Sequence, residues 1–275
     1  MFKECPRKYF YRYILGYEIL PSIHMTRGSI VHSVLEDFFE ASLDGVDESN
    51  FRQKLQGIAF SSLIKEWDGR KDELVKFKLS PAQLQLYFEE TIVMLLNWLN
   101  AFCEKIERRK KPLVDAFKEL SPVSKEKLYE SQKHAVRGFI DTVLHVDGEV
   151  HIMDYKTSKS SEITDDYHLQ LAIYAMLYEE THGKPPDKVG INFLRHGEKF
   201  VPVDRQLIEF AKREVALVHQ KTQTDHIDDY PKCVSSACRW CDFYKHCFQQ
   251  KTIREVLAEN AGAASRREPI VSKVA

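Results

Sequence analysis

Residues 136–156, which read VRGFIDTVLHVDGEVHIMDYK, decide the fold of this chain. The sequence changes to a period of two from Leu128 onward, and Asp147-Gly148 in the middle of this stretch is a dipeptide typical of two-residue hairpin turns. The pattern therefore predicts two antiparallel strands, at residues 136–146 and 149–156.

The register of this hairpin brings two carboxylates together. With a two-residue turn, Val146 faces Glu149, and counting back along both strands places Asp141 opposite Asp154. Facing residues share a sheet face with Cβ atoms roughly 4.5–5.5 Å apart, and like charges there are destabilising. A divalent cation such as Mg²⁺ or Mn²⁺, which prefers oxygen ligands, would relieve the repulsion. Lys156 projects from the same face as Asp154, because side chains alternate along a strand.

Two carboxylates and an ammonium group on one sheet face suit phosphoryl chemistry. A metal ion held by carboxylates polarises a phosphoryl oxygen and lowers the pKa of a bound water molecule. The ammonium group of Lys156 can orient that water or neutralise charge that develops on phosphorus. The alternative is a surface hairpin with ordinary charges and an ion pair, since the register is inferred from the turn alone.

The rest of the chain alternates between helical and strand patterns. Apolar residues at helical spacing follow Arg27-Gly28, and residues 45–125 read as helical, with a capping box at Ser80–Gln83. After the hairpin we expect a helix at residues 165–182, short strands at 189–194 and 199–203, and a helix at 207–220. This order predicts an α/β fold with a mixed central sheet flanked by helices.

Four polar residues on the predicted helices each have an ordinary interpretation. His32 and Glu36, four residues apart beside an apolar stripe, read as a polar helix residue and a solvated charge. Gln170 and Tyr174 have the same spacing on the helix after the hairpin and can form its polar edge. Spacing alone does not assign a function to any of them.

The cysteines cluster near one end of the chain. Cys238, Cys241 and Cys247 form a Cys-x₂-Cys-x₅-Cys pattern, and a fourth thiolate must come from Cys233 or Cys5. Four thiolates suit zinc or an iron–sulfur cluster, and spacing does not separate the two. The N-terminal sequence has no apolar signal region, which predicts a cytoplasmic, reducing location where clustered cysteines bind metal more often than they form disulfides.

Composition excludes some classes of protein and conceals a charge asymmetry. The chain has 275 residues, 43% of them hydrophobic, so it is not wholly disordered, and it has no long uncharged apolar run that would span a membrane. Its formal net charge is −1. Residues 1–27 and 232–255 each carry five Lys or Arg against two acids, so together they would form a basic lobe near +6 able to follow a DNA backbone.

Five motifs in this order resemble a known family. They are CPRKYFYRYILGYE, RGSIVHSVLEDFFE, GFIDTVLHVDGEVHIMDYKTSKS, HLQLAIYAMLYEE and CRWCDFYKHC, and they span residues 5–248. The set resembles the RecB-like branch of the PD-(D/E)XK nuclease superfamily. Within it, the similarity is to iron–sulfur members such as the CRISPR-associated RecB-like exonucleases, the AddB-type helicase–nuclease subunits and exonuclease V.

The resemblance implies a restriction-endonuclease-like mixed sheet and a role for each motif residue. It implies that a divalent metal is held by His32, Asp141, Asp154 and the backbone carbonyl of Tyr155. It implies that Lys156 is the catalytic lysine and that Gln170 and Tyr174 support the active site and its DNA. It implies a [4Fe–4S] cluster that joins the two ends of the chain, held by Cys5, Cys238, Cys241 and Cys247.

The resemblance also implies an organisation of the chain. We expect a cluster-forming segment at residues 1–27, a nuclease core at 28–231 with the helical stretch as an insertion, a cysteine segment at 232–250 and a flexible tail at 251–275. Relatives carry a short serine-containing segment before the first cysteine, whereas four residues precede Cys5 here, so the first structural element of the family is expected to be missing.

The implied function is a Mg²⁺- or Mn²⁺-dependent DNA nuclease, most simply an exonuclease on single-stranded DNA. The expected context is DNA repair and recombination or CRISPR adaptation, where other proteins of those systems would be partners. Two alternatives stay open. One is a non-catalytic DNA-binding or scaffold subunit, and the other is a zinc-stapled protein whose hairpin carboxylates are incidental.

Overall fold

The computed structural model describes residues 1–265, which divide into two compact units. One unit comprises residues 21–216, and the other comprises residues 1–20 together with the described residues from 217 onward. The expected tail at 251–275 begins with a helix, α10 (Ile253–Ser265), and its remainder lies outside the described residues. No helix of the described residues has the length and apolar character needed to cross a membrane.

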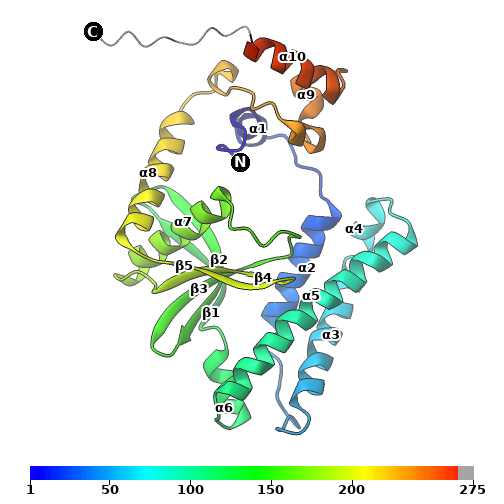
Figure 1. Ribbon diagram of the computed structural model, residues 1–275, viewed down its shortest axis with the longest axis vertical. Coiled ribbons are helices and arrows are strands. Elements are labelled where there is room, and N and C mark those ends of the chain that lie inside the picture. The colour runs from blue at the N-terminus through cyan, green and yellow to red at the C-terminus, as the bar shows by residue number, and fades with distance from the viewer. Residues whose placement is uncertain (266–275) are drawn as a thin grey trace. The chain divides into compact units, whose positions relative to one another are not determined.

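The unit of residues 21–216 consists of a five-stranded sheet and the helices around it (Figure 1). Its elements in chain order are α2 (Ile23–Phe38), α3 (Phe51–Gly69), α4 (Lys71–Lys76), α5 (Pro81–Arg108), α6 (Leu113–Leu120), β1 (Ser124–Ser131), β2 (Val136–Val146), β3 (Glu149–Lys156), α7 (Asp165–His182), β4 (Lys188–Phe193), β5 (Gly197–Pro202) and α8 (Arg205–Lys221), which continues into the other unit.

The sheet is mixed, as the sequence predicts. Its strands lie in the order β1-β2-β3-β4-β5, and all neighbours are antiparallel except β3 and β4, which are parallel and connected through α7. The predicted hairpin is confirmed, because β2 and β3 pair from Val146 and Glu149 back to Thr142 and Met153. Its turn residues, Asp147 and Gly148, both have positive φ, as a tight two-residue turn requires.

Helix starts follow the capping chemistry of the sequence. The predicted capping box is confirmed at α5, where Ser80 accepts from the Gln83 N–H and the Gln83 side chain accepts from the Ser80 N–H. Helix α2 begins at Ile23, four residues before the expected start, because Ser22 caps it by accepting from the Met25 N–H. The stretch expected to be helical contains α3 to α6, and β1 begins at its end.

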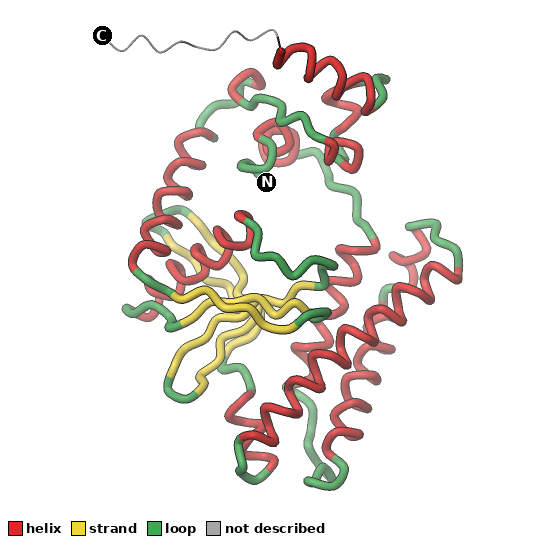
Figure 2. Tube along the Cα trace, in the orientation of Figure 1, coloured by secondary structure: helices red, strands yellow, loops and turns green. Residues whose placement is uncertain are grey.

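Helices flank the sheet (Figure 2), and two apolar clusters pack them against its two faces. One cluster packs α7 and the first part of α8 against β2, β3 and β4, with Leu171, Ile152 and Ile191 among its fully buried members. The other cluster joins α2, α3, α5 and α6 to Tyr155, which projects from the opposite face of β3. The site residues on β2 and β3 are therefore held between two packed layers.

The second unit brings the two ends of the chain together. It contains α1 (Pro6–Tyr9), the π-helix η1 (Phe10–Ile14), the 3₁₀ helices η2 (Ile227–Asp229) and η3 (Ser236–Trp240), α9 (Tyr244–Phe248) and α10. The Arg7 Nε–H donates to the Tyr230 carbonyl at 2.7 Å. Phe10, Tyr11, Tyr230 and Phe243 form its buried aromatic core. Aromatic packing thus joins segments more than 200 residues apart.

Candidate active site

Three carboxylates lie in a row across three adjacent strands. The β2–β3 register, extended by one pair beyond Thr142 and Met153, places Asp141 opposite Asp154. The β1–β2 register is the same before and after Glu126, which places Glu126 of β1 opposite Asp141 of β2. Asp141 therefore has Asp154 on one neighbouring strand and Glu126 on the other. The predicted pair of acids is therefore flanked by a third.

The pairing of β1 with β2 is interrupted at the row of carboxylates. Glu126 has a φ of 44°, a left-handed conformation that is uncommon for a residue other than glycine and that concentrates at functional sites. Neither Glu126 nor Asp141 is paired in the β1–β2 ladder. The Asp141 Oδ2 instead accepts a hydrogen bond from the Tyr155 N–H at 2.9 Å. Side chains thus replace part of the backbone pairing at this point.

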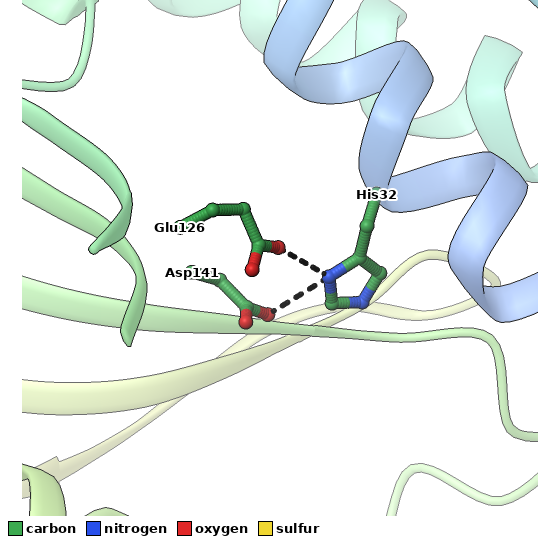
Figure 3. Close-up of side chains that lie close together, drawn as sticks. All are labelled: His32, Glu126 and Asp141. Atoms are coloured by element: carbon green, nitrogen blue, oxygen red, sulfur yellow. Dashed lines mark hydrogen bonds and ion pairs between the residues drawn. The ribbon is translucent and has the colours of Figure 1, made fainter. Parts of the chain in front are cut away.

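Helix α2 places His32 over the row (Figure 3). Its Nδ1 lies 2.9 Å from Glu126 Oε1 and 3.5 Å from Asp141 Oδ2. Its Nε2 lies 3.1 Å from the carbonyl oxygen of Tyr155. Among the described residues, His32, Glu126 and Asp141 are the one group of three or more His, Cys, Asp or Glu residues whose ligand atoms all lie within 4.8 Å of one another.

The charges of the site are unfavourable without a cation. Burial raises the pKa of Asp141 to about 7, and the negative charge of Asp154 adds to this effect. Burial also raises the pKa of Asp154, against the opposing charge of Lys156. Burial disfavours the charged form of His32, but the hydrogen bond to Glu126 and the charge of Asp141 outweigh it and raise the pKa to about 9. The histidine partly offsets the acids as a cation would.

Asp154 and Lys156 form a close pair at the end of β3. Their Oδ2 and Nζ atoms are 2.5 Å apart, and Asp154 is 1% exposed. Among the described residues, Lys156 is thus the close charged partner of the buried Asp154 Oδ2. A buried carboxylate oxygen in this state suits a hard divalent ion. Asp154 lies outside the group formed by His32, Glu126 and Asp141, and it pairs with Lys156.

Helix α7 brings the predicted Gln170 and Tyr174 to the same site. The Gln170 Nε2–H donates to the Tyr174 hydroxyl at 2.9 Å. Burial raises the pKa of Tyr174, and the negative charges of Asp154 and Asp141 raise it further, so the phenol lies near both acids. The ring packs on β2 at Gly138, where an added Cβ would lie 3.4 Å from it. All the residues predicted around the hairpin thus converge on one place.

The predicted cluster ligands Cys5, Cys238, Cys241 and Cys247 all lie in the second unit, and all six cysteines of the chain are free. Burial raises the pKa of Cys241, and the charges of Cys238 and Cys5 add to this rise. Burial likewise raises the pKa of Cys247, with further contributions from Cys241 and Cys5. The four residues thus share one unit, but no three cysteine sulfurs of the described residues lie within 4.8 Å of one another.

Sequence reasoning missed Glu126. The acid lies in a run of alternating charges, and the turn between β1 and β2 carries no dipeptide that would set the register of those strands. The available signal is the period-two pattern around Leu128, which predicts a strand but not the residue that faces Asp141.

Comparison with known proteins agrees with this geometry. A family model described as the PD-(D/E)XK nuclease superfamily matches residues 1–248. The chain is 29% identical over 119 residues to Gene 69 protein of Mycobacterium phage D29, covering 41% of this chain and 42% of that protein. It is 28% identical over 122 residues to the CRISPR-associated exonuclease Cas4 of Francisella tularensis subsp. novicida (strain U112), covering 43% and 59%.

A third relative is much longer than this chain. It is an ATP-dependent helicase/nuclease subunit of Clostridioides difficile (strain 630), 26% identical over 170 residues, which cover 58% of this chain and 12% of that protein. The chain thus spans less than two thirds of the length of each of these three relatives.

Proposed function

The chain belongs to the PD-(D/E)XK nuclease superfamily, and we propose that it is a metal-dependent DNA nuclease that digests single strands from their ends. The observation that carries the proposal is the row of Glu126, Asp141 and Asp154 with Lys156 beside it. A row of acids on adjacent strands is costly for folding alone and suits a cation-dependent reaction on a phosphodiester.

The residues present fit a Mg²⁺ or Mn²⁺ ion. His32, Asp141 and Asp154 would hold it together with the Tyr155 carbonyl oxygen, and Glu126 joins this set because it lies within reach of His32 and Asp141. Most of these donors are oxygen atoms, which hard divalent ions prefer. The ion, when bound, polarises a phosphodiester oxygen and lowers the pKa of a water molecule.

The chain's own side chains supply the remaining chemistry. The Lys156 ammonium group, held beside Asp154, orients the attacking water and neutralises charge that develops on the phosphate. Tyr174 closes the site from α7 and is fixed by its hydrogen bond from Gln170. Both residues support the geometry of the site and the DNA within it.

We also place a [4Fe–4S] cluster on Cys5, Cys238, Cys241 and Cys247. Cys241 and Cys247 pack against the aromatic core that also holds the first residues of the chain, and Cys5 lies in the same unit, which supports the assignment. The cluster would reinforce the aromatic packing that already joins the two ends of the chain. A cytoplasmic location, where thiols stay reduced, is consistent with it.

End-labelled DNA tests the proposed nuclease activity. With Mn²⁺, we expect a linear single strand to be shortened from an end while a circular single strand of the same sequence resists, and EDTA should abolish the reaction. DNA binding without cleavage in Mg²⁺ or Mn²⁺ would contradict a nuclease and favour a non-catalytic role. Equal digestion of the circular strand would show that the protein is an endonuclease and not an exonuclease.

Replacement of one cysteine tests the cluster. In anaerobically purified protein, Cys241→Ser should remove the visible absorbance and most of the iron, and should lower the Tm. Cys233→Ser is the matched control, because Cys233 is exposed and lies outside the proposed ligand set. Wild-type protein that is colourless and contains zinc would show that the thiols hold a different metal.

A further inference from the structure

Two arginines share one carboxylate near the end of β3. The Arg27 Nη1–H of α2 donates to Glu90 Oε2 of α5 at 2.7 Å, and the Arg195 Nη2–H, just after β4, donates to the same oxygen at 2.8 Å. Two guanidinium groups against one carboxylate leave one positive charge in excess. We call Arg27, Glu90 and Arg195 the arginine pair site.

Within the arginine pair site Arg27 is buried, whereas Arg195 and Glu90 are partly exposed. Arg27 is 3% exposed, and the Nε atoms of both arginines are buried without a hydrogen-bond partner. Burial lowers the pKa of the neighbouring His24, and the positive charges of Arg27 and Lys159 lower it further. A buried excess of positive charge is costly unless an anion compensates it. We therefore expect an anion to bind beside these arginines when the protein is bound to its substrate.

The arginine pair site adjoins the proposed active site. Arg27 lies five residues before His32 on the same helix, and a Cβ added at Gly28 would lie 4.0 Å from the hydroxyl of Thr157, the residue after Lys156. The Leu194 N–H donates to the Lys156 carbonyl at 3.1 Å, which holds the start of the Arg195 loop against the end of β3. An anion on these arginines would therefore lie close to a phosphate bound beside Lys156.

A cavity of about 420 Å³ opens beside Arg195. Its lining includes three asparagines (Asn97, Asn100 and Asn192), Trp98 and three charged residues (Glu104, Lys105 and Glu198), of which Lys105 pairs with Glu198. Amide side chains offer both donors and acceptors, the combination that reads nucleobase edges. The cavity follows the face of α5 that carries Glu90, since Asn97 lies two helical turns further along. Phosphate and nucleotide subsites would thus lie end to end.

We propose that Arg195, which Glu90 holds beside the buried Arg27, binds a phosphate of the DNA strand adjacent to the scissile one, with the attached nucleotide in the asparagine-lined cavity. The inference rests on the proposed nuclease function and deepens it. Guanidinium groups bind phosphate through paired, charge-assisted hydrogen bonds, which Glu90 prepares by holding both groups in place.

The salt dependence of DNA binding tests the arginine pair site. A fluorescein-labelled single strand would be titrated with wild-type protein and Arg195→Gln at several salt concentrations, with Ca²⁺ in place of Mg²⁺. We expect Arg195→Gln to raise the Kd roughly tenfold at low salt, because it removes a charge-assisted contact. The slope of log affinity against log salt should become shallower by about 0.7, the value for one phosphate contact on a single strand.

Two further variants separate a binding role from a structural one. Arg195→Lys keeps the charge and should keep the wild-type slope. Arg205→Gln is the control, because Arg205 is an exposed arginine on α8 that pairs with Glu179 and Glu209. If Arg195→Gln lowers the Tm but its slope matches that of Arg205→Gln, the arginines hold the fold together and the inference is overturned.

The two proposals fail in different ways. Wild-type protein that neither cleaves nor binds single-stranded DNA would remove the proposed function. Wild-type protein that cleaves DNA, with an unchanged slope for Arg195→Gln, would leave the nuclease in place and remove only the phosphate subsite.

Discussion

Asp154→Asn should lower the rate of DNA cleavage by about a thousandfold or more. The substitution keeps the shape of the side chain but removes a charged oxygen ligand, and metal-ion stabilisation of phosphoryl chemistry amounts to several kcal/mol, with each 1.36 kcal/mol equal to a factor of ten. The variant should still fold, because it removes one of two like charges buried side by side. The measurement is the single-turnover cleavage rate in Mn²⁺.

A second measurement identifies the role of Asp154. Saturating Mn²⁺ should raise the Tm of wild-type protein by several degrees, because about 2.7 kcal/mol of stabilisation is gained at one hundred times the Kd. Asp154→Asn should lose most of this rise. Asp68→Asn is the matched control, since Asp68 is an exposed acid paired with Lys71 on the surface. A full Mn²⁺-dependent rise in Asp154→Asn would show that Asp154 is not a metal ligand.

Lys156→Met should lower the cleavage rate by about a hundredfold to a thousandfold while leaving the Mn²⁺-dependent rise in Tm in place. The lysine lies 2.5 Å from Asp154 and 5.4 Å from the centre of the Tyr167 ring, so it is held where charge would develop on the phosphate. Loss of a preorganised charge-stabilising donor has an effect of this size.

The control for this variant is Lys71→Met, which removes the other member of the exposed surface pair. The rate of Lys71→Met should equal that of wild type. If Lys156→Met cleaves DNA at more than a tenth of the wild-type rate, the lysine stabilises the resting charge of Asp154 and takes no part in the reaction.

The parts of the fold with strong local signals could be predicted from the sequence. The Asp147-Gly148 turn fixed both the bounds of β2 and β3 and their register, because a two-residue turn leaves one pairing. The capping box at Ser80 likewise set the start of α5. The convergence of His32, Gln170 and Tyr174 on the hairpin came instead from the resemblance of five motifs to a family, since nothing local to those residues indicates it.

The parts that depend on long-range packing could not be predicted. Glu126 faces Asp141 only because β1 pairs with β2 through a turn without a register signal, and because its backbone adopts a left-handed conformation. Arg27, Glu90 and Arg195 come from three segments of the chain separated by 63 and 105 positions. No periodic pattern relates such residues, so their meeting appears only in the folded chain.

The hairpin turn subjects the site to a constraint on length as well as on residue type. Asp141 and Asp154 each lie six residues from the turn, and neither contributes to its conformation. Because the strand period is two, one residue inserted in the turn would slip the register and present the opposite face of β3 to Asp141. Every site residue would remain in such a sequence, yet the row of acids would be gone. When activity is inferred for a related sequence, a turn of the same length is therefore as strong an indication of an intact site as the presence of the acids.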